Sequence, residues 1–247
     1  MKRIRYLIVI TVLMLHVVVV SSLYAVKQEI LSIQDVSYSY YGNYKGWLSV
    51  PDTGQSLYPA ILYNYDQYID WMGVSLSEKI GYDLKAFMSA FESWGYATLI
   101  PLERYHKLNA LKGALVYLRN HSKIDASRIV VIGVGQGALL SILAMQKNVP
   151  VAGLVLLAPE QIHNTGHFSY SNIIRQMDQI NVPILFISGK SYQRWKNVSS
   201  QLLYELLKEY NKDVIYKEYN VKKRWFWYTQ FRYMTDIRAF INTLGAR

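Results

Sequence analysis

The chain has 247 residues, of which 51% are hydrophobic and 18% are charged, and it carries a formal net charge of +10. This composition is typical of a single globular domain and excludes a disordered chain. The chain has no cysteine, which excludes disulfide bonds, thiol catalysis and a cysteine-ligated metal.

Residues 1–25 have the pattern of a targeting segment. The cations Lys2, Arg3 and Arg5 come first, and a nearly unbroken apolar run over 6–20 follows. This order predicts a secretory signal peptide, and cleavage would leave 26–247 as the mature domain. An uncleaved membrane anchor is the alternative, because the apolar run is long enough to span a bilayer. Either interpretation predicts an exported protein that is periplasmic, secreted or held on the outer face of a membrane.

Predicted strands and helices alternate along the rest of the chain. The predicted strands are 34–40, 44–51, 59–66, 96–101, 128–133, 151–159, 183–189 and 214–219. The predicted helices are 77–94, 108–120, 136–147, 198–210 and 228–244. A looser stretch lies at 160–179. The two closely spaced first strands predict an antiparallel start. The regular alternation that follows predicts a mostly parallel central sheet of about eight strands with helices on both faces.

The stretch 128–140 predicts a buried strand, a sharp glycine turn and a helix. Two interpretations fit this turn. The first is the dinucleotide fingerprint, written here as Gly133-Val-Gly135-Gln-Gly137-Ala138, with Glu160 as the acid that would bind a ribose. The second is the strand–turn–helix that carries a nucleophile, Gly-x-Ser-x-Gly, with Gly135 in place of the serine. A dinucleotide turn normally follows the first strand of its domain, whereas about four predicted strands precede this one, which favours the second.

The longer context resembles the dienelactone hydrolase and prolyl-oligopeptidase-like branch of the α/β-hydrolases. A typical stretch of that branch is Asp-x-x-Arg-Ile-x-x-x-Gly-x-Ser-x-Gly-Gly, and this chain reads Asp125-Ala-Ser-Arg128-Ile-Val-Val-Ile-Gly133-Val-Gly135-Gln-Gly137-Ala138. The segments 46–51, 59–62 and 182–189 resemble strands of the same family in the same order. The resemblance covers about residues 30–244 and implies the α/β-hydrolase fold.

The resemblance also implies a serine, an acid and a histidine in that chain order. Gly135 replaces the serine and has no side-chain atom that could attack a substrate. The stretch 190–195, where the acid is expected, has no Asp or Glu, and the loop 221–227, where the histidine is expected, has no His. Glu160 is a fallback acid. The absence of all three residues from the expected positions predicts that the catalytic triad has been lost.

Other polar side chains give weaker indications of a site. His163 and His167 lie in the looser stretch and are expected to be ordinary loop or surface histidines. Together with Glu160 they would make only an incomplete metal site, so we expect no metal and no cofactor.

The cleft above Gly135 is the candidate binding site. The backbone N–H of Gln136, at a helix N-terminus, is an oxyanion-type donor. The residues at the end of the third strand, where a second donor is expected, are Asn64, Tyr65 and Asp66. With Glu160 they form a candidate site for a carboxylate, phosphate or carbonyl group that is bound without being cleaved. The alternative is that these groups merely cap a helix and a strand.

Aromatic residues make up 14% of the chain, and the run 222–228 combines rings with cations in the loop where the histidine is expected. The favoured interpretation is structural: Trp225, Trp227 and Phe231 anchor the last helix while the lysines stay solvated. The functional alternatives are a platform for a glycan or peptide and a contact with an anionic membrane. No nucleic-acid-binding motif is present, so we expect no nucleic-acid partner.

The sequence therefore predicts an exported α/β-hydrolase-fold protein that is a pseudoenzyme. It would bind an unknown small-molecule, glycan or protein ligand through the vestigial cleft above Gly135. The alternative is an esterase-like or dienelactone-hydrolase-like enzyme with a rearranged active site, so the sequence leaves open whether the chain is an enzyme.

Overall fold

The structure is a computed structural model. The residues that it describes are 32–103, 107–160, 162, 166, 168–189 and 194–245. The predicted signal peptide or anchor at 1–25 lies outside the described residues, as do His163 and His167. No helix in the described ranges is both long and apolar enough to cross a membrane.

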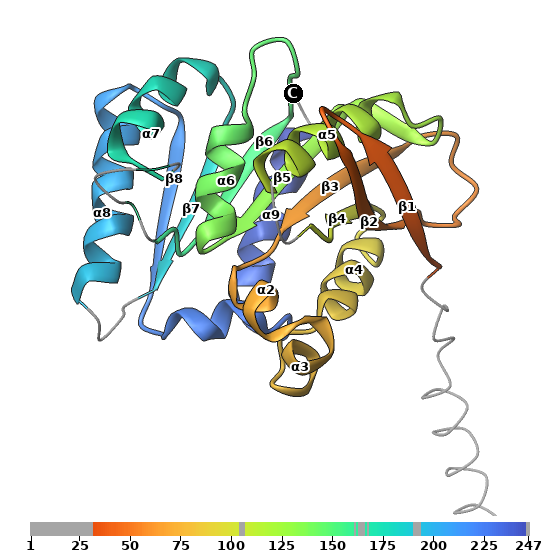
Figure 1. Cartoon of the computed structure of the whole chain (residues 1–247), viewed down its shortest axis with the longest axis horizontal. Coiled ribbons are helices and arrows are strands. Elements are labelled where there is room, and N and C mark those ends of the chain that lie inside the picture. Colours follow the sequence, from red (N-terminus) through yellow and green to blue (C-terminus); the bar gives the residue numbers. More distant parts are fainter. Residues whose placement is uncertain are drawn as a thin grey trace, which may run out of the picture. The chain divides into compact units, whose positions relative to one another are not determined.

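An eight-stranded sheet forms the centre of the domain (Figure 1). Its strands are β1 (Ile33–Ser39), β2 (Asn43–Ser49), β3 (Tyr58–Asn64), β4 (Ala97–Pro101), β5 (Ile124–Val134), β6 (Gly153–Leu157), β7 (Ile184–Gly189) and β8 (Val214–Tyr219). The order across the sheet is β1-β2-β4-β3-β5-β6-β7-β8. β2 pairs antiparallel with both β1 and β4, and all the other neighbouring strands in the sheet are parallel. The predicted mostly parallel sheet with an antiparallel start is confirmed.

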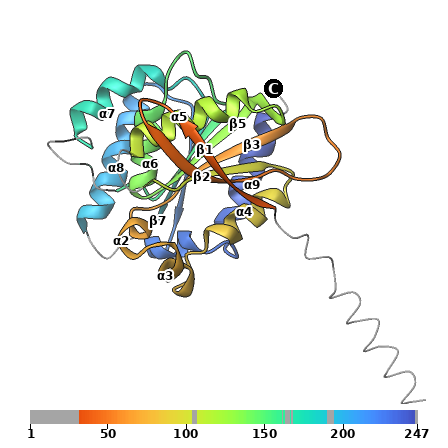
Figure 2. The ribbon, with the colours of Figure 1, turned by 45° about the vertical axis from the view of Figure 1, so that its right-hand side comes forward.

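Helices cover both faces of the sheet (Figure 2). They are α2 (Tyr68–Met72), α3 (Val74–Lys79), α4 (Leu84–Glu92), α5 (Lys107–Asn120), α6 (Gln136–Ala144), α7 (Tyr170–Gln176), α8 (Arg194–Glu209) and α9 (Tyr233–Leu244), with the 3₁₀ turns η1 (Met177–Gln179) and η2 (Lys223–Trp227). α5, α6, α7 and α8 lie on one face, and α4 and α9 lie on the other (Figures 1 and 2).

The prediction of one helix over 77–94 is wrong, because the chain turns between α3 and α4. Gly81 has a φ of +95°, and the ring of Tyr228 packs directly against it, so the position accepts no side chain without a shift. Asp83 then caps α4, and its carboxylate accepts hydrogen bonds from the N–H of Lys85 at 2.8 Å and of Ala86 at 3.2 Å.

Two other predicted boundaries also need correction. The predicted helix 228–244 begins only at Tyr233, and the chain before it forms η2. The looser stretch 160–179, to which no helix was assigned, contains α7 and η1.

The core follows from the burial of the central strands on both faces. Every residue of β3, β4 and β6 is buried, which explains their nearly continuous apolar sequences. The face under α5, α6 and α8 is largely aliphatic. The opposite face is aromatic near the carboxyl end of β3, where the ring of Tyr63 stacks on Phe87 with centroids 4.8 Å apart.

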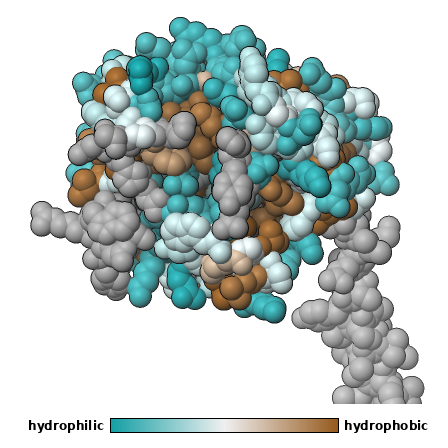
Figure 3. Space-filling model, in the orientation of Figure 1, coloured by the Kyte–Doolittle hydropathy of each residue, from teal (hydrophilic) through white to brown (hydrophobic). Residues whose placement is uncertain are grey.

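The surface seen in Figure 3 is mostly hydrophilic, with an apolar patch over α3 at the lower margin of the view. Leu76 and Ile80 are exposed there, at 48% and 40%. Exposed apolar side chains in such small numbers are normal on folded proteins.

The strand order brings several loops to one place. The chain passes from β3 to β4 on one side of β3 and then to β5 on the other side, so the order of the sheet reverses between β3 and β5. Loops at the carboxyl ends of parallel strands meet beside such a reversal, which is where ligands bind in open α/β sheets. The loops after β3, β5, β6 and β8 therefore frame the candidate site.

Candidate functional site

A tight turn at Gly135 joins β5 to α6. Gly135 has a φ of +58° and a ψ of −119°, a backbone conformation that side chains make costly. The turn packs closely against the end of β3, because a Cβ on Gly137 would lie 2.5 Å from the backbone oxygen of Tyr65. The side-chain amide of Asn64 donates to the Gly137 carbonyl at 2.8 Å, and the Ser141 hydroxyl donates to the same oxygen at 2.8 Å.

The space above Gly135 is occupied by Lys223, the first residue of η2. Its ammonium forms ion pairs with Asp66, which follows β3, and with Glu160, which follows β6. The exposed fractions of the Lys223, Asp66 and Glu160 side chains are 9%, 0% and 3%. A Cβ on Gly135 would lie 2.6 Å from Lys223 Nζ and closer still to the Asp66 carboxylate. We refer to Asp66, Lys223 and Glu160 as the buried ion triad.

Local hydrogen bonds fix the backbone that carries each carboxylate. The N–H of Asp66 donates to the Tyr82 hydroxyl at 3.0 Å, and the Asp66 carboxylate accepts from the N–H of Tyr68 at 3.3 Å. On the other side, Ala158 has a φ of +43°, an uncommon conformation for a residue with a side chain. The Ser200 hydroxyl donates to the Pro159 carbonyl at 2.5 Å and ties this turn to α8.

The segment that carries Lys223 is anchored by rings. Trp227, the last residue of η2, stacks on Tyr82 with centroids 5.2 Å apart and an interplanar angle of 4°. The Tyr233 hydroxyl lies 3.1 Å from the carbonyl oxygen of Phe226 and 2.9 Å from that of Tyr228. The ammonium of Lys223 also lies 5.2 Å from the centroid of the Tyr68 ring, a cation–π distance.

The triad holds one cation between two carboxylates in a site closed to water. Burial raises the pKa of the Asp66 carboxyl above its ordinary value, the nearby Lys223 ammonium opposes this rise, and the Glu160 carboxylate adds to it. The burial of Asp66 outweighs its pairing with Lys223, so this carboxyl holds its proton more tightly than an Asp side chain in water does.

The structure brings together only some of the residues expected to form the site. Asp66 and Glu160 meet through Lys223, whereas the Asn64 amide is used by the Gly137 carbonyl. Tyr65 belongs to a neighbouring cluster, where its hydroxyl donates to Asp70 at 3.2 Å. Gln136 is the half-buried first residue of α6, and its role as a donor stays a prediction. The described part of the chain contains no group of three or more His, Asp or Glu placed to hold a metal ion.

Lys223 was missed by the sequence reasoning, and the expectation that the lysines of 222–228 stay solvated is wrong for this residue. Lys222, Lys223 and Arg224 are consecutive cations, and charge alone does not reveal which of them turns inward. The available signal was indirect. A glycine at the place of the nucleophile leaves room beside an acid, and a cation is the group that such a space best accepts.

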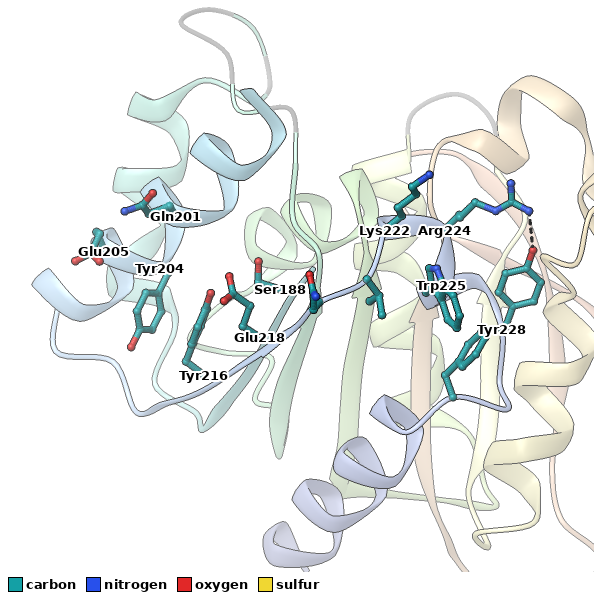
Figure 4. Close-up of a pocket in the computed structure, with 13 residues that line it drawn as sticks. Ser188, Gln201, Tyr204, Glu205, Tyr216, Glu218, Lys222, Arg224, Trp225 and Tyr228 are labelled. Carbon is teal, nitrogen blue, oxygen red and sulfur yellow. Dashed lines mark hydrogen bonds between the residues drawn. The ribbon is translucent and has the colours of Figure 1, made fainter. Parts of the chain in front are cut away.

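A groove of about 1230 Å³ lies on the other side of η2 (Figure 4). Its walls come from α8, from the carboxyl ends of β7 and β8, and from the segment 220–231. Lys223 points away from this groove into the triad, whereas Lys222, Arg224 and Trp225 line it. The predicted anchoring role therefore fits the buried Trp227, while Trp225 is 39% exposed.

Comparisons with known proteins identify the fold. No protein-family model and no curated protein matches the chain. The solved structure of esterase Est22 matches with a TM-score of 0.64 at 14% identity, over 88% of this chain and 81% of that one. A fungal esterase from Rhizomucor miehei matches with a TM-score of 0.65 at 13% identity, over 87% and 84%. An acylaminoacyl peptidase from Pyrococcus horikoshii matches at 0.60 and 14%, over 81% of this chain and 38% of that one. The chain therefore has the α/β-hydrolase fold, and identities this low show the fold alone.

The first prediction concerns Gly135→Ala. The added methyl group would combine an unfavourable backbone conformation with a collision against the triad, so we expect the free energy of unfolding to fall by about 2–4 kcal/mol. Gly54→Ala is the matched control, because Gly54 also has a positive φ, +76°, but has open space around it. We expect the control to cost about 1 kcal/mol. If urea denaturation shows that both variants lose the same free energy of unfolding, the triad does not fill the space above Gly135.

The second prediction concerns the pH dependence of stability. The pKa of Asp66 in the folded state lies above the ordinary value of 3.8, so the stability that its protonated form contributes is fully present below that pH. This contribution is lost as pH rises through the folded-state pKa. Asp66→Asn removes the titration, so the stability of the variant relative to the wild type should rise as pH increases above the ordinary value of 3.8.

The double variant Asp66→Asn/Glu160→Gln tests the same arrangement from the other side. It leaves the Lys223 ammonium buried without a carboxylate, and we expect a loss of about 3–5 kcal/mol. Asp52→Asn, at an exposed turn, controls for the loss of a surface carboxylate. A double variant as stable as Asp66→Asn alone would contradict the ion triad.

Proposed function

We propose that this chain is a non-catalytic member of the α/β-hydrolase superfamily, resembling the dienelactone hydrolase branch, that binds a ligand or partner without cleaving it. The observation that carries this proposal is the occupation of the space above Gly135 by the buried ion triad. A hydrolase of this fold needs that space for its nucleophile and for the substrate carbonyl.

The chemistry of the residues supports the proposal. Gly135 offers no nucleophilic atom, and Lys223 stands in the loop where the resemblance places a histidine. A general base must accept a proton from the nucleophile, whereas an ammonium group has only hydrogens to donate. Glu160 stands where a fallback acid would orient a histidine, but it pairs with Lys223 instead. The buried ion triad thus stands where a hydrolase would have the residues that relay a proton.

The same geometry bears on where a ligand binds. A ligand carboxylate or carbonyl directly above Gly135 would have to displace Lys223 from both of its carboxylates, which costs several kcal/mol. We therefore propose that binding takes place beside the vestigial centre, along the carboxyl ends of the strands. The pattern of residues 1–25 supports the further proposal that the protein is exported.

Measuring catalytic activity tests this proposal. The wild-type chain and Gly135→Ser are assayed for turnover of p-nitrophenyl esters and for covalent labelling by a fluorophosphonate, with an active serine esterase as the positive control. We expect neither turnover nor labelling in either protein. The serine variant stays inert because no residue at the place of the histidine can take its proton.

Two outcomes would reject this function. Labelling of any serine in the wild-type chain would favour the alternative, an esterase-like enzyme with a rearranged site. Turnover by Gly135→Ser alone would show that a working base is present and that the triad yields to a nucleophile.

A further inference from the structure

We propose that the groove between α8, β8 and the segment 220–231 binds an oligosaccharide that carries carboxylate groups. This inference deepens the proposed function and rests on it in one respect, namely that the saccharide is bound and not cleaved. The groove is separate from the buried ion triad, because η2 stands between them and only its outward side chains reach the groove.

Aromatic rings line the groove from two directions (Figure 4). Tyr204 of α8 and Tyr216 of β8 form one pair, with ring centroids 4.4 Å apart. Trp225 and Phe231 form the other, with centroids 4.2 Å apart. Tyr216 and Trp225 are each 39% exposed, so parts of their rings are open to a ligand. Flat aromatic faces pack against the C–H groups on the face of a pyranose ring, and the amphipathic rings tolerate nearby hydroxyls.

Polar side chains lie between these rings. Ser188, at the end of β7, and Glu218 of β8 lie in the middle of the view in Figure 4, with Gln201 on the α8 side. Hydroxyl, carboxylate and amide groups together supply both donors and acceptors. A sugar presents hydroxyls that donate and accept at close spacing, so this mixture suits it.

The lining favours a saccharide over a peptide. Among the described residues that line the groove, Val221 is the one aliphatic side chain, whereas five are aromatic. Peptide-binding grooves usually provide apolar pockets for side chains and a strand or helix surface for the backbone. The volume of about 1230 Å³ also exceeds what a single small metabolite fills and suits a chain of sugar units.

Two cations at one end of the groove favour an anionic saccharide. Lys222 and Arg224 lie on the same side of the groove as Trp225 (Figure 4). Arg224 donates to the Tyr228 hydroxyl at 3.2 Å and has no carboxylate partner within the described ranges. Two carboxylates also line the groove. Glu205, at the α8 side, is paired with Lys208 at 2.7 Å, and Glu218 lies in the middle, so the cationic end is the one beside Trp225. The formal net charge of +10 favours the approach of a polyanion.

The experiment measures binding of short oligogalacturonates to the full-length chain by titration calorimetry at fixed ionic strength. Malto-oligosaccharides of the same length form the neutral arm, and polyglutamate of similar charge forms the peptide arm. We expect binding in the first arm only. Trp225→Ala should weaken it at least about tenfold, and so should the double variant Lys222→Ala/Arg224→Ala, which should also show less dependence on salt.

Matched controls come from outside the groove. Tyr41→Ala removes a tyrosine that is 91% exposed, and Lys79→Ala removes an exposed lysine of α3. Both should leave affinity within about twofold, a change below 0.5 kcal/mol. Thermal unfolding of each variant separates lost affinity from lost fold.

Several results would overturn the groove as an acidic-saccharide site. One is that no ligand binds in any arm. Another is that the neutral saccharide or polyglutamate binds as tightly as the oligogalacturonate or more tightly. The third is that Tyr41→Ala and Trp225→Ala lose affinity equally. The length of the oligogalacturonate after incubation is a separate readout. If the oligogalacturonate binds and is shortened, the non-catalytic function is rejected and the groove remains a binding site. If it neither binds nor is shortened, the groove alone is rejected as the site.

Discussion

One buried ammonium held by two carboxylates determines how the functional end of this domain is built. Asp66, Lys223 and Glu160 come from the loops after β3, β8 and β6, so the ion pairs connect loops from three strands of the sheet. Removing charges from water costs several kcal/mol per ion, and only close pairing repays it. Each of the three loops must therefore keep its position for the other two to be stable, and the stacked rings of Trp227 and Tyr82 hold the lysine segment in register.

Gly135 and the triad depend on each other. The turn between β5 and α6 needs a backbone conformation that favours glycine, and the ammonium and the Asp66 carboxylate lie where any side chain at this position would begin. A nucleophile and this triad cannot occupy the same space. The glycine at this turn and the inward lysine of the loop after β8 therefore fit the same space together. The outward side of the same short turn, with Lys222, Arg224 and Trp225, forms a wall of the neighbouring groove.

Much of the fold was predictable because its signals are local and strong. Central strands such as β6 are buried on both faces and read as short apolar runs, and the glycine turn marks the start of α6. The break between α3 and α4 was not predictable in the same way. It depends on Gly81 packing under Tyr228, whose hydroxyl donates to the Ile80 carbonyl across 148 residues of sequence.

The candidate site was also predictable from the sequence only in part. Asp66 and Glu160 could be placed at the carboxyl ends of their strands from the sequence alone. The inward turn of Lys223 could not, because it is set by a 3₁₀ turn and by ring packing that the charge pattern does not encode.

Lys223 is sealed inside the triad, whereas its neighbour Lys222 is exposed. Amine-selective labelling of the native protein, with the modified positions located by mass spectrometry, tests this directly because adjacent lysines are compared in one molecule. We expect Lys222 to be modified readily and Lys223 to react only after unfolding. Modification of both lysines at similar rates in the folded protein would contradict it.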